Sequence, residues 1–213
     1  MLALQRSLRE RRANGSIGDL LITVEHDPVL TIGRRGSRGN LLVAEDDLAA
    51  EGICLFEVER GGDITYHGPG QLVVYPIVDL RDHGRDLHGY VEGLEEATIR
   101  TLRAFGVDGR REPGLPGVWT DAGKIASIGV HVRRWITMHG LALNVAVERR
   151  HFEMIRPCGL SVRAVSMCEI TEVSVGLRDV TERFLDEACE VFGWTFELVG
   201  SDEIARWSRG ADA

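Results

Sequence analysis

The stretch IASIGVHVRRWITMHGLALNV, residues 125 to 145, decides the fold of this chain. Its two halves, residues 125 to 132 and 136 to 145, alternate in side-chain character and are rich in β-branched residues, which is typical of strands. The pair Arg133 and Arg134 lies between the halves. The stretch therefore predicts two antiparallel strands joined by a turn, and a sheet at the centre of the fold.

Further strand and helix patterns surround this pair. β-rich runs occupy residues 20 to 24, 29 to 32, 53 to 58 and 72 to 78. Apolar residues at helical spacing predict one amphipathic helix over residues 88 to 105 and a second that ends before Gly193. The predicted fold class is α/β (α+β), a mixed β-sheet flanked by helices, with two helices on one side.

Composition limits the kind of protein this is. The chain has 213 residues, 44% of them apolar, which suits one globular domain over residues 1 to 213. Its apolar runs fall far short of the roughly 20 residues of a membrane-spanning helix, so we expect no membrane association. The first 15 residues lack the continuous hydrophobic core of a secretory signal, which predicts a cytoplasmic location.

The charge of the chain favours some classes of partner over others. A formal net charge of −8 argues against a nucleic-acid partner. Three arginine pairs, Arg34/Arg35, Arg133/Arg134 and Arg149/Arg150, are nevertheless candidate local basic patches for docking acidic proteins.

The four cysteines show neither a metal-binding nor a disulfide pattern. There is no CxxC spacing and no HExxH, so we expect no metal site and no structural disulfide. Cys54, Cys168 and Cys189 are predicted to be small buried apolar residues. Cys158 differs because Pro157 stiffens the backbone before it and a glycine follows it, which would present an exposed nucleophile. A buried, inert thiol is the alternative.

Lys124 is the only lysine, against 24 arginines. An ammonium can lose its proton when it is desolvated or lies beside another cation, whereas a guanidinium stays charged. The position therefore points to a need for an amine, although a compositional bias towards arginine would also leave one surface lysine. An ammonium beside Cys158 would lower the pKa of that thiol. The two residues are 34 positions apart, so the sequence allows them to meet but does not require it.

A glycine-rich segment runs from Arg60 to Gly70. Four glycines allow backbone N–H groups to approach a ligand closely, and polar residues lie between them. No GKS or GKT follows, so the segment is not a phosphate-binding P-loop. A tight connection between strands is the structural alternative.

Three motifs together carry a family resemblance: RGGDITYHGPGQLVVYPIVDL (60 to 80), GVWTDAGKIASIGVHVRRWITMHGLALNV (117 to 145) and PCGL (157 to 160). In order and spacing they resemble the lipoyl(octanoyl) transferases of lipoate biosynthesis, over roughly two-thirds of the chain. The resemblance implies the catalytic-domain fold of biotin and lipoate protein ligases. It implies Cys158 as the nucleophile and Lys124 as the residue that lowers its pKa. The acyl-substrate contacts it implies are Arg60, Gly61, Gly62, Asp63, Ile64, Thr65, Tyr66, His67, Ser127, Ile128, Gly129, Gly140, Leu141 and Ala142.

The resemblance also implies a reaction. The octanoyl group of octanoyl-acyl carrier protein would move to Cys158 and then to a lysine of an apo lipoyl domain, in 2-oxoacid dehydrogenase complexes or the glycine cleavage H protein. Neither a cofactor nor ATP is expected, because thioester exchange is nearly balanced in energy and amide formation is downhill. Three alternatives remain at this point: an ATP-dependent ligase on the same fold, a non-catalytic module that binds acyl chains or carrier protein, and a cysteine hydrolase.

Overall fold

The computed structural model describes residues 1–156, 163–171, 174–200, 204 and 207. Its larger sheet is entirely antiparallel and has six strands. In sheet order these are β1 (Leu20–Val24), β5 (Gln71–Ile77), β9 (Ile136–Asn144), β8 (Gly123–Arg133), β7 (Leu115–Thr120) and β6 (Arg110–Glu112).

A second, smaller sheet contains β3 (Cys54–Glu57), β2 (Val29–Ile32) and β4 (Ile64–His67) in that order. Strand β2 pairs parallel with β3 and antiparallel with β4. The predicted fold class, a mixed arrangement of strands flanked by helices, is confirmed. The strands are divided between two sheets, and the glycine-rich segment that was predicted only as a loop contains β4.

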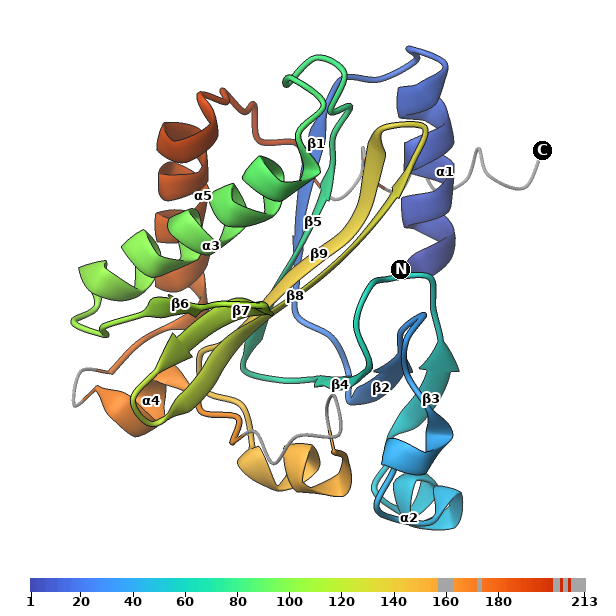
Figure 1. Cartoon of the computed structure of the whole chain (residues 1–213), viewed down its shortest axis with the longest axis vertical. Coiled ribbons are helices and arrows are strands. Elements are labelled where there is room, and N and C mark those ends of the chain that lie inside the picture. Colours follow the sequence, from blue (N-terminus) through green and yellow to red (C-terminus); the bar gives the residue numbers. More distant parts are fainter. Residues whose placement is uncertain (157–162, 172–173, 201–203, 205–206, 208–213) are drawn as a thin grey trace.

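Helices cover both faces of the larger sheet (Figure 1). α3 (Leu87–Ala104) and α5 (Leu177–Phe192) cover one face, as predicted, and α1 (Leu2–Ala13) packs on the other. α3 begins where the Asp86 side chain accepts a hydrogen bond from Gly89 N, and α5 ends at Gly193, whose φ of 67° closes the helix. The shorter helices are α2 (Glu45–Ala50), α4 (Met167–Ile170), and the 3-10 turns η1 (Arg38–Asn40) and η2 (Arg149–Met154).

Strand β5 explains how the two faces are used. Leu72 and Val74 join the core under α3 and α5, together with Leu94 and Phe184. The alternating residues of the strand, Val73 and Tyr75, point to the opposite face, beside Ala142. All seven residues of β5 are buried, because both faces of the strand are covered.

The turn between β8 and β9 lies where the sequence predicts it. Arg133 pairs with Ile136, and the two residues between them, Arg134 and Trp135, have φ angles of 53° and 69°. Positive φ at both central residues is the geometry that matches the twist of a two-residue hairpin. Leu80 N donates to Trp135 O at 2.8 Å, which supports the turn.

The prediction that three cysteines are buried is wrong. Cys54 and Cys168 are exposed and Cys189 is half-buried. Cys54 lies on β3, an edge strand of the smaller sheet, so one of its sides is open. Within the described residues, no helix is long and apolar enough to cross a membrane.

Candidate active site

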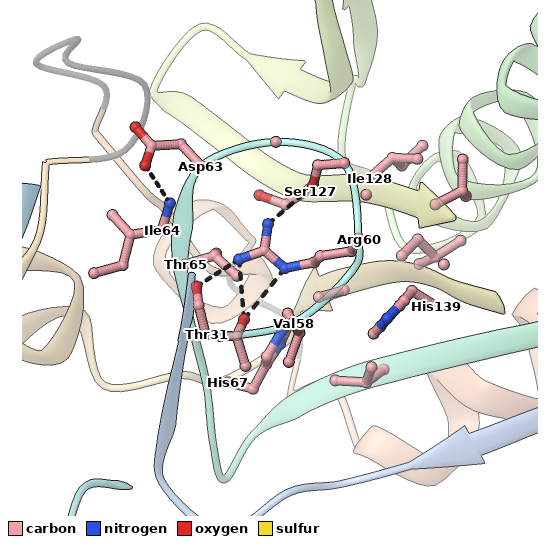
Figure 2. Close-up of a pocket in the computed structure, with 18 of the residues that line it drawn as sticks. Thr31, Val58, Arg60, Asp63, Ile64, Thr65, His67, Ser127, Ile128 and His139 are labelled. Atoms are coloured by element: carbon pink, nitrogen blue, oxygen red, sulfur yellow. Dashed lines mark hydrogen bonds between the residues drawn. The ribbon is translucent and has the colours of Figure 1, made fainter. Parts of the chain in front are cut away.

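A cavity of about 1290 Å³ lies mainly on the face of the larger sheet that carries Val73, Tyr75 and Ala142, and it extends past β7 as far as Val91 of α3. Its wall is formed by β5, β8 and β9, by the smaller sheet and by the first residues of the chain. Figure 2 shows part of it, with Arg60 between Thr31 on one side and Ser127 and Ile128 on the other. The lining includes thirteen of the fourteen predicted substrate contacts: Arg60, Gly61, Gly62, Asp63, Ile64, Thr65, His67, Ser127, Ile128, Gly129, Gly140, Leu141 and Ala142.

Tyr66 is the exception. In the described part of the chain it does not line the cavity, and it is 1% exposed. Its ring packs against His151 and Phe152, on the other side of β4 from His67. A strand alternates its side chains, so a run of consecutive residues cannot all face one ligand. Burial raises the pKa of Tyr66 to about 12, so its hydroxyl stays protonated.

The two predicted tripeptides from β8 and β9 lie directly opposite each other. Ser127 pairs with Ala142, Ile128 with Leu141, and Gly129 with Gly140. Gly129 lets the Arg60 loop approach: Gly61 N donates to Val130 O at 2.9 Å, and a Cβ on Gly129 would lie 2.8 Å from Gly61 O. The small residues of these strands therefore make the room in which the cavity lies.

Lys124 lies near the start of β8 and also lines the cavity. Its ammonium donates a hydrogen bond to Pro116 O at 2.8 Å and lies 5.0 Å from the centroid of the Trp119 ring. Gly117 of β7, which pairs with Ser127, has a φ of 123°, and a Cβ there would lie 2.3 Å from Ala126 O and 2.8 Å from Lys124 Cε. A side chain at position 117 would therefore clash with the backbone of β8 and with the lysine.

Cys158 lies outside the described residues. The described residues on either side of it, Arg156 and Arg163, are both bonded to residues that line the cavity. Arg156 N donates to Asn40 O at 2.8 Å, and Arg163 O accepts from Lys124 N at 2.8 Å.

Arg60 is held in a fixed position. Its Nη2 donates to Thr31 O at 2.6 Å and to Thr31 Oγ1 at 2.9 Å, and its Nη1 donates to Gly61 O at 3.0 Å. The side chain is buried, so it places a positive charge inside the cavity wall. Asp63 holds the neighbouring loop, because its carboxylate accepts from Asn40 Nδ2 at 2.5 Å and from Ile64 N at 2.7 Å.

A chain of buried hydrogen bonds fixes the state of His67. Asn144 Nδ2 donates to Val165 O at 3.0 Å, which leaves Asn144 Oδ1 to accept from Gln71 Nε2 at 2.9 Å. Gln71 Oε1 must then accept from His67 Nδ1, at 2.8 Å. Burial, and then the charge of Arg60, lower the pKa of His67 to about 3. The ring is therefore neutral, with its proton on Nδ1 and a lone pair on Nε2.

The cavity wall also contains residues that the sequence did not single out, among them His26, Tyr75, His139 and Asn144. The Tyr75 hydroxyl and His26 Nε2 are 2.8 Å apart. His139 has a φ of 59°, and its N–H donates to Gln5 Oε1 of α1 at 2.8 Å; burial lowers its pKa to about 4. Polar side chains inside otherwise apolar strands were the signal that could have identified them.

Known proteins share this chain's sequence and fold. A family model described as lipoyl protein ligase A/B catalytic domain matches residues 1–189. An octanoyltransferase from Solibacter usitatus is 46% identical over 96% of this chain and 91% of its own, and one from Geobacter metallireducens is 51% identical over 81% and 76%. These matches confirm the resemblance seen in the three motifs.

Solved structures agree at the level of the fold. Lipoate-protein ligase A bound with ATP has a TM-score of 0.80 at 19% identity, covering 99% of this chain and 88% of its own. Ta0514 of T. acidophilum, a putative lipoate protein ligase with bound lipoic acid, has a TM-score of 0.77 at 18% identity, covering 98% and 86%. The chain belongs to the lipoyl protein ligase A/B catalytic domain family.

Proposed function

We propose that this chain is an octanoyltransferase of lipoate biosynthesis and that it works through a thioester on Cys158 with Lys124 as the proton carrier. Relatives of that name, 42% to 51% identical over 81% to 96% of this chain, support the transfer itself. One observation carries the mechanism. The only lysine of the chain lies at the cavity, and its strand is bonded to the segment that follows Cys158 in the sequence.

In the first half-reaction, the Cys158 thiolate attacks the carbonyl carbon of the octanoyl thioester on acyl carrier protein. The tetrahedral intermediate then loses the carrier's pantetheine sulfur, which takes a proton from the Lys124 ammonium. The products are the octanoyl-enzyme, the free carrier thiol and a neutral Lys124. Pro116 O holds the amine at 2.8 Å, so the lysine is oriented before the donor arrives.

In the second half-reaction, the ε-amine of a lysine on an apo lipoyl domain attacks the acyl-enzyme. As the C–S bond breaks, the Cys158 thiolate leaves, and the neutral Lys124 accepts the proton that the attacking amine must lose. The product is an octanoyl amide, and the enzyme returns to its thiolate and ammonium state. The acceptors we propose are the lipoyl domains of 2-oxoacid dehydrogenase complexes and the glycine cleavage H protein.

The cavity provides the acyl site. Burying about six methylenes at roughly 0.8 kcal/mol each stabilises the bound chain by about 5 kcal/mol. Val73 and Ala142 supply an apolar wall, and the Arg60 to Gly62 loop and His67 also line the cavity. We assign the whole chain to one catalytic domain and place it in the cytoplasm, where reducing conditions keep a cysteine nucleophile as a free thiol.

The test is the intact mass of the protein after mixing with octanoyl-acyl carrier protein in the absence of ATP. We expect a hydroxylamine-labile octanoyl adduct on the wild type and none on Cys158→Ala. Cys168→Ala is the matched control, since that thiol is exposed on α4 and should not affect the adduct.

An adduct that persists in Cys158→Ala would contradict the mechanism, and peptide mapping would then ask whether Cys54, which also lines the cavity, carries it. If no variant forms an adduct until ATP and octanoate are supplied, the chain is an ATP-dependent ligase instead.

A further inference from the structure

A second cavity, of about 520 Å³, lies beside the first. We call it the arginine cavity. Its lining residues are Arg6, Arg9, Arg34, Glu57, Val58, Glu59, His131 and Arg133. They come from α1, from the loop after β2, from the end of β3 and from the last part of β8. Val58 lines both cavities, and His139 Nε2 of the larger one lies 3.7 Å from Glu59 Oε2 of the smaller. The two cavities therefore adjoin.

Each carboxylate of the arginine cavity pairs with an arginine, although Glu59 Oε2 is buried without a hydrogen-bond partner among the described residues. Glu59 pairs with Arg6 at 2.6 Å, and Glu57 pairs with Arg38 at 3.2 Å. The remaining cations, Arg9, Arg34 and Arg133, form no ion pair with a carboxylate in the part of the chain that the structure describes. A chain with a net charge of −8 thus gathers three guanidinium groups in one cavity and leaves them uncompensated there.

The burial of Arg9 without a counter-charge is energetically unfavourable. It is 9% exposed, and the hydrogen bond it donates goes from Nη1 to Met138 Sδ at 3.6 Å, where the acceptor is a weak one. A buried charge needs a counter-charge or strong hydrogen bonds, so a guanidinium in this setting is suited to receive an anion.

His131 lies among the charges of the arginine cavity. The pKa of His131 is lowered, first by burial and then by the charge of Arg9; Glu59 opposes this shift, and Arg34 and Arg133 add to it. The three guanidinium groups therefore all act on one ring that lines the cavity.

The third arginine pair behaves differently. Arg149 pairs with Glu153 at 3.3 Å, and Arg150 pairs with Glu148 at 2.9 Å and with Glu51 at 3.0 Å. These side chains are neutralised by their surroundings and line neither cavity among the described residues. Of the three candidate basic patches, only the first two contribute a cation to a cavity.

We propose that the arginine cavity binds the phosphate at the end of the acyl donor's pantetheine arm. The proposal rests on the proposed function, because it assigns a further site to the same donor. Guanidinium groups match phosphate oxygens through paired hydrogen bonds. Because Arg9 is only 9% exposed, a phosphate at the end of a slender arm can reach it more readily than a carboxylate on the surface of a folded acceptor domain.

Strand β8 links the two ends of this arrangement. Lys124 and His131 are seven residues apart on the strand, which corresponds to about 23 Å at 3.3 Å per residue. An extended pantetheine arm, in which two amides separate the thiol from the phosphate, has a comparable span. The length of the arm therefore suits the separation of Lys124 from the arginine cavity along this strand.

The first experiment compares octanoyl-4′-phosphopantetheine with octanoyl-pantetheine as donors in single-turnover formation of the acyl-enzyme. One phosphate held by charged hydrogen bonds should make the phosphorylated donor about 10- to 100-fold more efficient for the wild type. The variant Arg34→Gln/Arg133→Gln should reduce this ratio to about 1 and leave the rate with octanoyl-pantetheine unchanged. Both side chains are exposed, so the fold should tolerate their loss. Arg149→Gln/Arg150→Gln is the matched control and should keep the wild-type ratio.

A calorimetric titration separates this proposal from the proposed function. Wild type should bind 4′-phosphopantetheine more tightly than pantetheine, and Arg9→Gln, once circular dichroism shows that it is folded, should lose that preference. If neither donor gives an acyl-enzyme, the transferase proposal fails while the titration still decides the phosphate site. Equal rates with both donors would overturn the phosphate site and leave the transferase standing. A variant that slows only transfer to the lipoyl domain would also overturn it, in favour of an acceptor site.

Discussion

The two faces of the larger sheet are equally buried but differ in what they contain. On the side of α3 and α5, large aliphatic residues such as Leu72, Val74 and Leu143 are fully packed. Some polar groups there bond within their own helix, as when Thr98 Oγ1 donates to Leu94 O at 2.7 Å. On the cavity side, small residues leave space, and buried polar groups such as Gln71 and Asn144 bond to one another. Burial therefore does not reveal which face does chemistry, whereas side-chain size and the partners of polar groups do.

The largest expected effect is on the cavity face. Lys124→Met should slow formation of the acyl-enzyme by about 10²- to 10⁴-fold, the usual contribution of a proton-transfer group, and change the free energy of unfolding little. Rapid-quench mass measurements and urea unfolding test the two parts. A variant that reacted at the wild-type rate would show that the lysine is not the proton carrier.

The opposite result is expected across the sheet. Phe184 of α5 is fully buried against the core, and Phe184→Ala should lower the free energy of unfolding by about 3 to 5 kcal/mol. The acyl-transfer rate per folded molecule should stay close to wild type. Urea unfolding and an active-site titration with octanoyl donor measure these quantities. A loss of rate as large as the one expected for Lys124→Met would mean that the faces are not independent.

Acid should destabilise the protein through two histidines on the cavity face. The pKa of His67 is about 3 and that of His139 about 4, against an ordinary 6.5. Below pH 6.5 the unfolded chain binds protons that the folded chain excludes. As the pH is lowered, the free energy of unfolding therefore decreases by about 1.4 kcal/mol per pH unit for each histidine. Above pH 6.5 neither state is protonated and the effect vanishes.

A substitution isolates one histidine. His139→Asn keeps a residue type that tolerates the positive φ of 59°, and it should flatten the stability profile between pH 6.5 and 4 by about 1.4 kcal/mol per pH unit. Urea midpoints across this range give the slope. The exposed His88→Asn is the control and should retain the wild-type slope. An unchanged slope in His139→Asn would mean that the neutral state of this ring does not limit stability.

The smallest effects are expected when an alanine is replaced by leucine on each of the two faces. Ala142→Leu adds bulk to the cavity wall and should shift the preference from octanoyl towards hexanoyl donors, by about fourfold for each methylene displaced. Ala97→Leu overpacks the core under α3 and should cost about 1 to 3 kcal/mol of stability without changing chain-length preference. Competition between the two donors, read by mass, gives the ratio. Equal shifts in both variants would remove Ala142 from the acyl site.

Local patterns predicted local structure well. The strands at residues 20 to 24 and 29 to 32 match β1 and β2, and the helix expected at 88 to 105 matches α3 to within one residue. α1 was not predicted, because its apolar stripe is interrupted by arginines and gains its stability from packing against Ile77 and Met138.

The site was predictable only in part. Composition identified Lys124, and the family motifs identified residues that do line the cavity. They did not exclude Tyr66, because a contiguous motif does not show strand alternation. The bonds of Gln71 to Asn144 and of Asn144 to Val165 join residues 73 and 21 positions apart, so no local pattern indicates them. The same holds for the arginine cavity, whose cations come from three separate segments.

The single lysine beside an aromatic ring has a practical consequence. A sample grown with lysine that is ¹⁵N-labelled only at Nζ will give one side-chain resonance, and the Trp119 ring, 5.0 Å from the ammonium, will move it away from the position of a solvated lysine. Its chemical shift then follows the protonation of one atom in the resting protein and in the acyl-enzyme. The proton that we propose Lys124 donates and recovers can therefore be followed by NMR without any assignment.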